Sequence, residues 1–393
     1  MALFSCSAGQ ESYEFPDLKH GIFCHHVLEG WKGAADGGDG QLDLDELVSY
    51  TRKQTQTFAR LKLASVQTPQ LRGEFDGTWV LRKSGVVPLP KLITSKSTGM
   101  KLTLIPAGTF LMGSSAADLR AAAQADSNFK AESAADEQQH SVRISQPFYM
   151  GVHEVTQGEY ESVMGTTPSD YSKTGDGKSS VGGMDTSKFP VEHVSWFDAI
   201  EFCNKLSVKD GLTPYYSLTA ITRGSGSIKS ATVSVSRAAS APGLLGYRRP
   251  TEAEWEYACR ANAATPTLWH TGNTLASLNE AGWWGAFSTP AGNSEKRTNR
   301  VGQKLANSFG LYDMHGNVFE WFFDVYDESV YGKRSGTTSD PTVTSGSEYR
   351  VLRGGSWNDL AGGPRTAVRD RLTPDFRVNA LGFRVVCLGV RTP

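Results

Sequence analysis

Short apolar runs separated by glycine-containing turns fill the chain from about Thr98 onward, and this pattern limits what the chain can fold into. Segments such as GTFLMG, FYMGVHEV, YRVLRGGSW and LGFRVVCL are typical of strands, whereas only two segments have the spacing of a long helix. The Ser- and Gly-rich stretch 219–240 predicts a long hairpin or a flexible loop. The 41 Gly and nine Trp indicate many turns and aromatic packing. We therefore expect an irregular α+β fold with sparse regular structure.

The two predicted helices carry clear start signals. SWFDAIEFCNKLSVKDG begins with Ser195 as an N-cap, and Asp198 three residues later completes a capping-box pair. PTEAEWEYACRA begins at Pro250 and Thr251, and the helical spacing turns Trp255 and Ala258 inward.

Residues 1–83 have a different texture and predict a separate segment. KHGIFCHHVLEGWKG has helical apolar spacing, Leu42 to Tyr50 predicts a second helix, and GTWVLRK is strand-like. Residues 84–97, with two Pro and no aromatic residue, indicate a linker to a domain over 98–393.

Charge and cysteine content exclude several classes of function. Lys plus Arg (40) balances Asp plus Glu (41), so the net charge of -1 gives no general attraction to nucleic acid. No apolar stretch approaches the roughly 20 residues of a membrane span. The start, MALFSCSAGQESYEF, has no signal-peptide pattern, which leads us to expect a cytoplasmic location unless the chain begins inside a longer one. The five Cys have neither disulfide nor zinc spacing.

Several motifs together carry a family resemblance. GTFLMGS, VHEVTQGEYESVMG, PVEHVSWFDAIEFCNKLS, GYRRPTEAEWEYACR, NSFGLYDMHGNVFEW, RVLRGGSW and LGFRVV follow one another in the chain. In this order they resemble the formylglycine-generating-enzyme (sulfatase-modifying-factor) domain over residues 98–390. The resemblance implies a C-type lectin-like fold. Arg249 departs from the apolar residue usual in the family, which we interpret as local surface variation.

The resemblance also identifies where the enzyme chemistry would lie. The sulfatase-activating members bind copper through two cysteines after the Gly-Gly-Ser motif, and thiolates are the ligands that Cu(I) needs. Those positions are Asp359 and Pro364 here. The histidines also lack the motif of the iron-dependent branch. We therefore expect no catalytic residue, no copper and no enzymatic activity; the rival hypothesis is a metal-dependent oxidase of the formylglycine-generating class.

The segment 350–386 resembles the hypervariable region of variable proteins from bacterial diversity-generating retroelements. In those systems mutation of template adenines, typically in Asn codons, alters selected positions within a fixed frame. The frame residues here are Arg353, Gly354, Gly355, Ser356, Trp357, Arg365, Ala367, Arg369, Pro374, Arg377, Gly382 and Phe383. The interleaved positions, all reachable from Asn codons through adenine changes, are Asp359, Leu360, Gly362, Gly363, Val368, Asp370, Arg371, Leu372, Phe376, Val378 and Ala380.

This resemblance implies a ligand-binding protein that displays a diversified surface site. The expected ligand is a protein or another macromolecule, with neither nucleic acid nor a membrane as partner. Two alternatives stay open: a surface loop that drifted in sequence, and a purely structural partner domain.

LYDMHGNVFEW resembles the family's calcium loop. The resemblance assigns carboxylate ligands to Asp313 and Glu320 and backbone carbonyl ligands to Gly316 and Val318. Such oxygen ligands suit Ca²⁺, which would have a structural role. The alternative is that Asp313 caps a turn and Glu320 pairs with an arginine.

The N-terminal segment resembles the C-terminal half of a caspase-like peptidase domain, with α/β structure. The family's catalytic His and Cys would lie before Met1, and Cys6 matches a later core strand, so we expect no peptidase dyad; a caspase-like peptidase remains the alternative. Asp36, Asp39, Gly40 and Glu46 predict a tight acidic turn, because the EF-hand spacing is incomplete. The segment is either a fragment of a longer natural chain or a remnant used as a docking platform.

Overall fold

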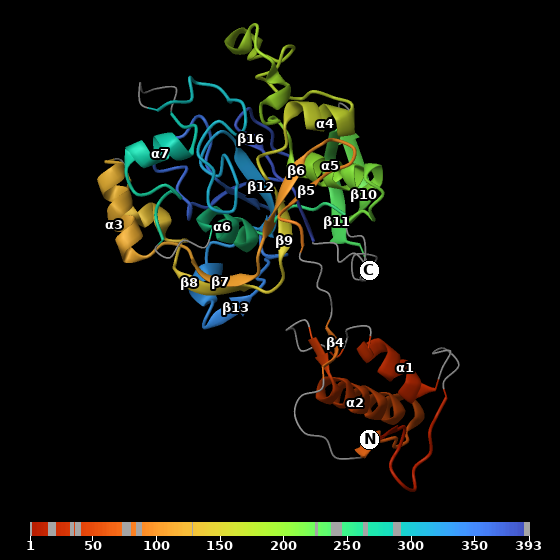
Figure 1. Ribbon diagram of the computed structural model, residues 1–393. Helices are drawn as coiled ribbons and strands as arrows, with labels where there is room; N and C mark the ends of the chain where they lie inside the picture. The colour runs from red at the N-terminus through yellow and green to blue at the C-terminus, as the bar shows by residue number, and fades with distance from the viewer. Residues whose placement is uncertain are drawn as a thin grey trace. The chain divides into compact units, whose positions relative to one another are not determined.

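The computed structural model divides the chain into two units, Met1–Leu89 and Pro90–Pro393, which are described one at a time (Figure 1). The residues that the structure describes are 2–14, 21–31, 35, 41–72, 80–83, 89–127, 129–224, 227–236, 246–261, 266–285 and 292–388.

In the described residues of the first unit there are two helices and two antiparallel strand pairs. The predicted helix around Phe23 is α1 (Ile22–Glu29). The prediction for the second helix was too short, since α2 runs over Leu44–Leu63. Its buried face continues through Thr51 and Thr55, whose polar side chains concealed the helical period from an apolar count. The strand pairs are β1 (Ala2–Phe4) with β3 (Gln70–Arg72) and β2 (Gln41–Asp43) with β4 (Val80–Lys83).

The structure corrects the prediction for Cys6 and describes only part of the predicted acidic turn. Cys6 lies beyond the end of β1 in a bend, where its thiol donates to the carbonyl of Gln10 at 3.2 Å, so it is not a strand residue. Glu46 closes a capping box with Asp43 at the start of α2. The remaining acidic-turn residues, Asp36, Asp39 and Gly40, lie outside the described residues.

The described part of the second unit contains three larger sheets and a hairpin, joined by irregular segments. The four-stranded sheet that leads to the variable segment has the order β15-β14-β12-β16, with β12 and β14 antiparallel. Its strands are β12 (Phe319–Val325), β14 (Arg350–Arg353), β15 (Asp370–Leu372) and β16 (Leu381–Gly382). The other strands are β5 (Leu92–Thr94), β6 (Lys101–Ile105), β7 (Gly108–Met112), β8 (His140–Ile144), β9 (Phe148–Gly151), β10 (Tyr216–Gly224), β11 (Ser227–Val235), β13 (Thr337–Ser339) and β17 (Val386–Leu388).

The two predicted helices are confirmed. Helix α5 (Trp196–Lys209) has the Ser195–Asp198 capping box, and α6 (Glu252–Arg260) starts after Thr251. Trp255 and Ala258 of α6 are fully buried. The short helices were not predicted individually; they are α3 (Ala116–Ala125), α4 (Gln157–Met164), α7 (Leu275–Ala281) and α8 (Val330–Lys333).

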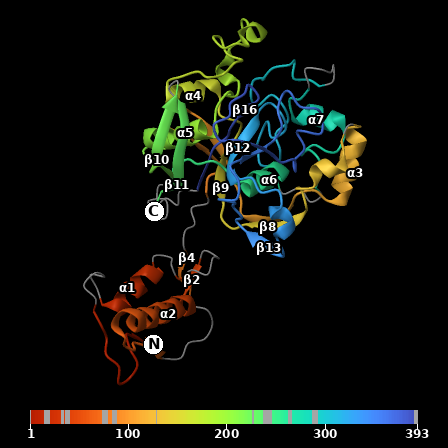
Figure 2. The same ribbon diagram turned by 180° about the vertical axis from the view of Figure 1, so that it is seen from behind.

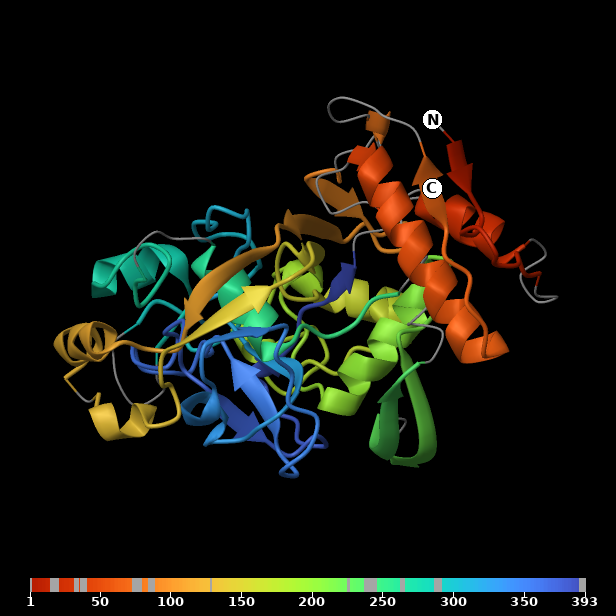
Figure 3. The same cartoon turned by 90° about the horizontal axis from the view of Figure 1, so that it is seen from below.

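Aromatic packing holds the centre of this unit together. Trp255 of α6 meets Phe322 of β12 edge to face, with 5.7 Å between ring centroids. A second apolar cluster joins α3 to α7 through Ala122 and Leu278, and both views of the ribbon show these helices side by side (Figures 1 and 2). The stretch 219–240 takes the hairpin alternative in its described part, where β10 and β11 extend beside α5 (Figure 3).

Two boundaries differ from the sequence prediction. Leu92–Thr94, placed in the linker, form β5 because they pair with β6. LGFRVVCL is two strands rather than one, because β16 pairs with β12 whereas β17 pairs with β9 in another sheet. The fold is otherwise the expected irregular α+β arrangement. In the described part of the chain, no helix is both long and apolar enough to cross a membrane.

Candidate functional site

The variable segment separates into buried and accessible positions. Frame residues such as Arg353 and Trp357 are fully buried, while Leu360, Phe376 and Val378 are 36%, 44% and 36% exposed. None of the interleaved positions is buried: Leu360, Asp370, Arg371, Phe376 and Val378 are exposed, and Asp359, Gly362, Gly363, Val368, Leu372 and Ala380 are partly exposed. Of the frame, only Pro374 and Arg377 are more than marginally accessible.

Buried arginines hold the backbone of this segment in place. Arg353 donates from Nη1 to the carbonyls of Ala367 and Val368 at 2.6 and 2.9 Å, and it forms an ion pair with Glu256. Arg365 makes two hydrogen bonds to the carboxylate of Glu137, at 2.9 and 3.1 Å. Bidentate guanidinium–carboxylate pairs fix direction as well as distance, so the accessible side chains project from a rigid support.

Trp357 and Gly355 set the start of the segment. The Trp357 indole donates to the carbonyl of Asn379 at 2.9 Å and meets the Tyr171 ring edge to face at 5.3 Å. Gly355 has φ of +68°, and a Cβ there would lie 2.8 Å from the backbone of Pro364. Any larger residue at 355 would therefore displace the loop.

The two positions that carry copper ligands in the sulfatase-activating enzymes lie in this loop. Asp359 accepts hydrogen bonds from the amide and the hydroxyl of Ser356, both at 2.7 Å, and burial raises the pKa of Asp359 to about 6. Pro364 is buried and its carbonyl contacts Nδ1 of His315 at 2.8 Å. Neither residue supplies a thiolate. Because Asp359 caps its own turn, its side chain is less free than the sequence prediction assumed.

Two of the assigned calcium-loop residues, Asp313 and Glu320, lie in a buried, acidic environment together with Glu154, and Gly316 and Val318 are buried as well. Asp313 accepts from the amide of Gly302 at 2.7 Å through Oδ2, while its buried Oδ1 has no hydrogen-bond partner. Both carboxylate oxygens of buried Glu154 are also without a partner. Burial raises the pKa of Asp313, and burial together with the Asp313 charge raises that of Glu154.

Glu320 belongs to the same environment but has a protein partner. Its carboxylate accepts from Nε and Nη2 of buried Arg384, with the closest approach at 2.8 Å. Glu320 therefore forms the arginine pair that the sequence offered as the alternative to calcium binding. The carboxylate oxygens of Asp313 and Glu154 that lack a hydrogen-bond partner still fit a divalent cation. Burying an ionised carboxylate without a partner costs free energy, and a bound cation would offset that cost. Glu154 was missed from the sequence; the only signal was an acidic residue between Val152 and Val155 in a strand-like motif.

The interpretation of Arg249 as surface variation is wrong. Its side chain is fully buried, and its three guanidinium nitrogens have no hydrogen-bond partner. The guanidinium lies over the Phe383 ring at 5.0 Å, and burial lowers its pKa to about 10. An arginine in place of an apolar residue therefore sits in the core.

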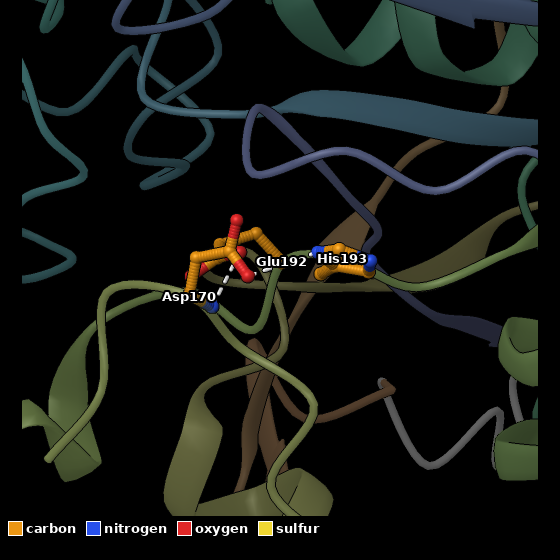
Figure 4. Close-up of side chains that lie close together, drawn as sticks. All are labelled: Asp170, Glu192 and His193. Carbon is orange, nitrogen blue, oxygen red and sulfur yellow. Dashed lines mark hydrogen bonds and ion pairs between the residues drawn. The ribbon is translucent and has the colours of Figure 1, made fainter. Parts of the chain in front are cut away.

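A third group of polar side chains lies beside the variable segment and was not predicted. Asp170, Glu192 and His193 come together from two loops, as Figure 4 shows. Nδ1 of His193 lies 3.0 Å from Oδ1 of Asp170, and Glu192 is fully buried. Burial raises the pKa of Glu192 to about 8. Asp170 lies 22 positions before Glu192 and 23 before His193, so spacing alone gives no sign of their contact.

Comparison with known proteins adds to this geometry. Residues 90–388 match the family model described as the sulfatase-modifying factor enzyme 1-like domain. The chain is 34% identical to chaperone protein LppX of Paenibacillus barcinonensis over 53% of this chain and 69% of that protein. It is 30% identical to the formylglycine-generating enzyme of Mus musculus, over 50% of this chain but only 44% of the enzyme.

A solved structure, Treponema denticola variable protein 1, is similar over 76% of this chain and 98% of its own, with 30% identity and a TM-score of 0.59. This similarity confirms the C-type lectin-like fold. The family match begins at residue 90, so the caspase-like interpretation of residues 1–83 stays a prediction. Because the family model covers most of the chain, this protein belongs to the sulfatase-modifying factor enzyme 1-like family.

Proposed function

We propose that this protein is a catalytically inactive ligand-binding protein, whose C-type lectin-like scaffold displays a diversified site over residues 359–380. One observation carries the proposal: accessible positions alternate with buried frame positions in the same segment. Similarity to the structure of Treponema denticola variable protein 1 supports the same conclusion.

The accessible side chains have the chemistry of a macromolecular binding surface. Leu360, Phe376 and Val378 expose apolar area, and Asp370 and Arg371 add exposed charges of both signs. Accessible apolar residues together with charged ones in one segment favour a protein or another macromolecule as the ligand. The arginine pairs beneath keep the loop ordered before binding, which lowers the entropy cost of association.

The absence of thiols at 359 and 364 supports catalytic inactivity. Copper chemistry in the family needs thiolate ligands, and Asp359 and Pro364 offer none. The competing hypothesis is a metal-dependent oxidase, which similarity to proteins named formylglycine-generating enzymes favours. The two hypotheses differ in a single measurable product, the formylglycine aldehyde.

We further propose a structural calcium site in the second unit. Asp313 and Glu320 would supply carboxylates and Gly316 and Val318 carbonyls, with Glu154 as an additional carboxylate ligand. The orphaned oxygens of Asp313 and Glu154 support this assignment. A bound cation would offset the repulsion among three buried carboxylates that face one arginine.

The proposed function can be tested with two matched display libraries. One library randomises Leu360, Asp370, Arg371, Phe376 and Val378; the control randomises five buried frame positions, namely Arg353, Trp357, Arg365, Ala367 and Arg369. Both are selected in calcium-containing, zinc-free buffer for folding and for binding to one purified protein, ovalbumin. We expect the first library to stay largely folded and to yield binders, and the control to lose folded display. Equal loss of folding in both libraries would contradict a diversified site.

A further inference from the structure

We propose that Asp170, Glu192 and His193 form a binding site for a divalent transition-metal ion such as Zn²⁺, next to the proposed ligand site. One ligand atom from each residue lies within 4.8 Å of the others. Atoms that each bind one ion at about 2 Å lie roughly 3.3 Å apart in tetrahedral geometry, so side-chain rotations that bring these atoms closer by about 1–1.5 Å would complete the site.

The local backbone prepares Glu192 for this role. Its two carboxylate oxygens accept hydrogen bonds from the amides of Asp170 and Tyr171, at 3.1 and 2.8 Å. These bonds orient the carboxylate but occupy only about half of its lone pairs. In the described part of the chain, no lysine or arginine forms an ion pair with Glu192. A buried carboxylate that lacks a cationic partner favours a bound cation.

The other two ligands are accessible to solvent and to an incoming ion. The side chains of His193 and Asp170 are 40% and 21% exposed, and they point toward each other (Figure 4). Metal binding would replace the hydrogen bond between Nδ1 of His193 and Oδ1 of Asp170, and the imidazole proton would shift from Nδ1 to Nε2. Nδ1 of His193 and Oδ1 of Asp170 would then both face the ion.

The donor set selects the class of metal. One imidazole nitrogen with two carboxylate oxygens suits Zn²⁺ or a related first-row ion, whereas Ca²⁺ and Mg²⁺ prefer oxygen ligands alone. Three protein ligands leave a coordination position open, which is typical of zinc sites that hold water or a ligand atom.

The position of the site connects it to the proposed ligand surface. The amide of His193 donates to the carbonyl of Val378 at 3.1 Å, and the amide of Trp196 donates to that of Pro374 at 3.0 Å. Tyr171, whose amide holds Glu192, also packs against Trp357. A metal ion here would therefore brace the backbone that carries Phe376 and Val378. This coupling, unlike the metal binding itself, rests on the proposed function.

The test is a zinc titration of the full chain by calorimetry, with calcium saturating, followed by metal analysis after desalting. Co²⁺ added in place of zinc should give visible d–d absorption that reports nitrogen and oxygen ligation. We expect one equivalent of zinc, and binding weaker by at least about tenfold in both His193→Asn and Asp170→Asn. Asn tolerates the positive φ of 62° at position 193, so the variant keeps the backbone conformation.

His25→Asn, in the first unit, serves as the matched control and should bind zinc like the unaltered protein. Thermal melts verify that each variant folds. If one of the two site variants does not fold, the zinc affinity of the other site variant tests the proposal. No stoichiometric zinc, equal affinity in the folded site variants, or loss of zinc from His25→Asn would each overturn the proposal. Since zinc is measured without any ligand and the libraries are selected without zinc, failure of one proposal is distinguishable from failure of the other.

Discussion

Arg369 of the variable segment and Glu252 of α6 form a two-pronged ion pair, with Nε–Oε1 and Nη2–Oε2 distances of 2.7 and 3.0 Å. The Arg369 side chain is fully buried, and Glu252 is nearly so. The strand that carries the exposed Arg371 is thus anchored by a residue two positions earlier. One short stretch therefore combines a structural role with a displayed one.

Replacing Arg369 should damage the fold far more than replacing Arg371. Arg369→Ala leaves the Glu252 carboxylate buried without this partner, and we expect a loss of about 3–5 kcal/mol in the free energy of unfolding. Arg371→Ala, the matched control, should lose about 1 kcal/mol or less because the side chain is exposed. Chemical denaturation of the full chain measures both, and equal losses would contradict the division into frame and displayed positions.

The displayed positions should control binding without controlling stability. Once a binder is selected on this scaffold, replacing its selected residues at positions 360, 371 and 376 by Ala should weaken binding by about 100-fold or more, the loss of roughly 3 kcal/mol typical of central contacts. The thermal midpoint should change little. A control that alters the exposed Val208, Ile221 and Leu305 outside the segment should leave the affinity unchanged. Binding that survives the first set would place the ligand site elsewhere.

Features that depend on residues close together in the chain, such as helix starts and strands, could be predicted from the sequence. The capping box at Ser195, the helix start at Thr251 and the central strand RVLR all depend on neighbours within a few residues, so their patterns are visible in the chain. The frame and displayed positions were separated through the resemblance to variable proteins, in which fixed and altered positions interleave, and most of the frame positions are buried whereas none of the interleaved positions is.

Long-range contacts could not be predicted in the same way. Glu154 meets Asp313, and Asp170 meets His193, only after loops distant in sequence have folded together. The misreading of Arg249 has the same origin. A charged residue is usually exposed, whereas the folded chain buries this one completely, with its guanidinium against the Phe383 ring.

Removal of calcium should lower the thermal midpoint of the second unit. A ligand that binds the native state stabilises it by mass action, so a chelator should destabilise the protein and Asp313→Ala should reproduce the effect. Glu154→Gln should weaken calcium binding measured by titration. Metal analysis that finds no calcium, together with an unchanged midpoint, would show that the carboxylates do not hold this ion.

The calcium-free protein should also lose stability as the pH rises. Burial raises the folded-state pKa of Asp313 and Glu154 above the unfolded values, so the native state binds more protons and stability falls as pH increases through that interval. Calcium keeps both groups ionised and should reduce this slope. Parallel stability–pH curves with and without calcium would contradict this linkage.

The purified chain should not convert a cysteine-containing sulfatase peptide to formylglycine, even with added copper. Asp359 and Pro364 cannot provide the two thiolates that hold Cu(I). Mass spectrometry of the peptide measures the aldehyde, with an active family member as the positive control. Detection of the product would favour the oxidase hypothesis over a binding protein.

Replacing the buried arginine at 249 should stabilise the protein. Arg249→Met removes a guanidinium that has no hydrogen-bond partner yet keeps most of the apolar volume, although it also loses the contact with Phe383. Because substitution of buried charges by apolar residues is often stabilising, we expect a gain of about 1–2 kcal/mol near neutral pH. The matched control is Arg384→Met, which breaks the buried pair with Glu320 and should destabilise.

The pH dependence of this gain distinguishes a buried charge from a simple packing effect. The folded-state pKa of Arg249 is lowered to about 10, so above that pH the native protein releases a proton that the unfolded chain retains. The unfolded state then binds more protons, and the unaltered protein gains stability as the pH rises from about 10 toward 12. Arg249→Met lacks this group, so its advantage should shrink over the same interval in denaturation curves measured side by side. A constant advantage would indicate that the variant acts through packing, and a loss of stability at neutral pH would mean that the Phe383 contact outweighs the cost of burying the charge.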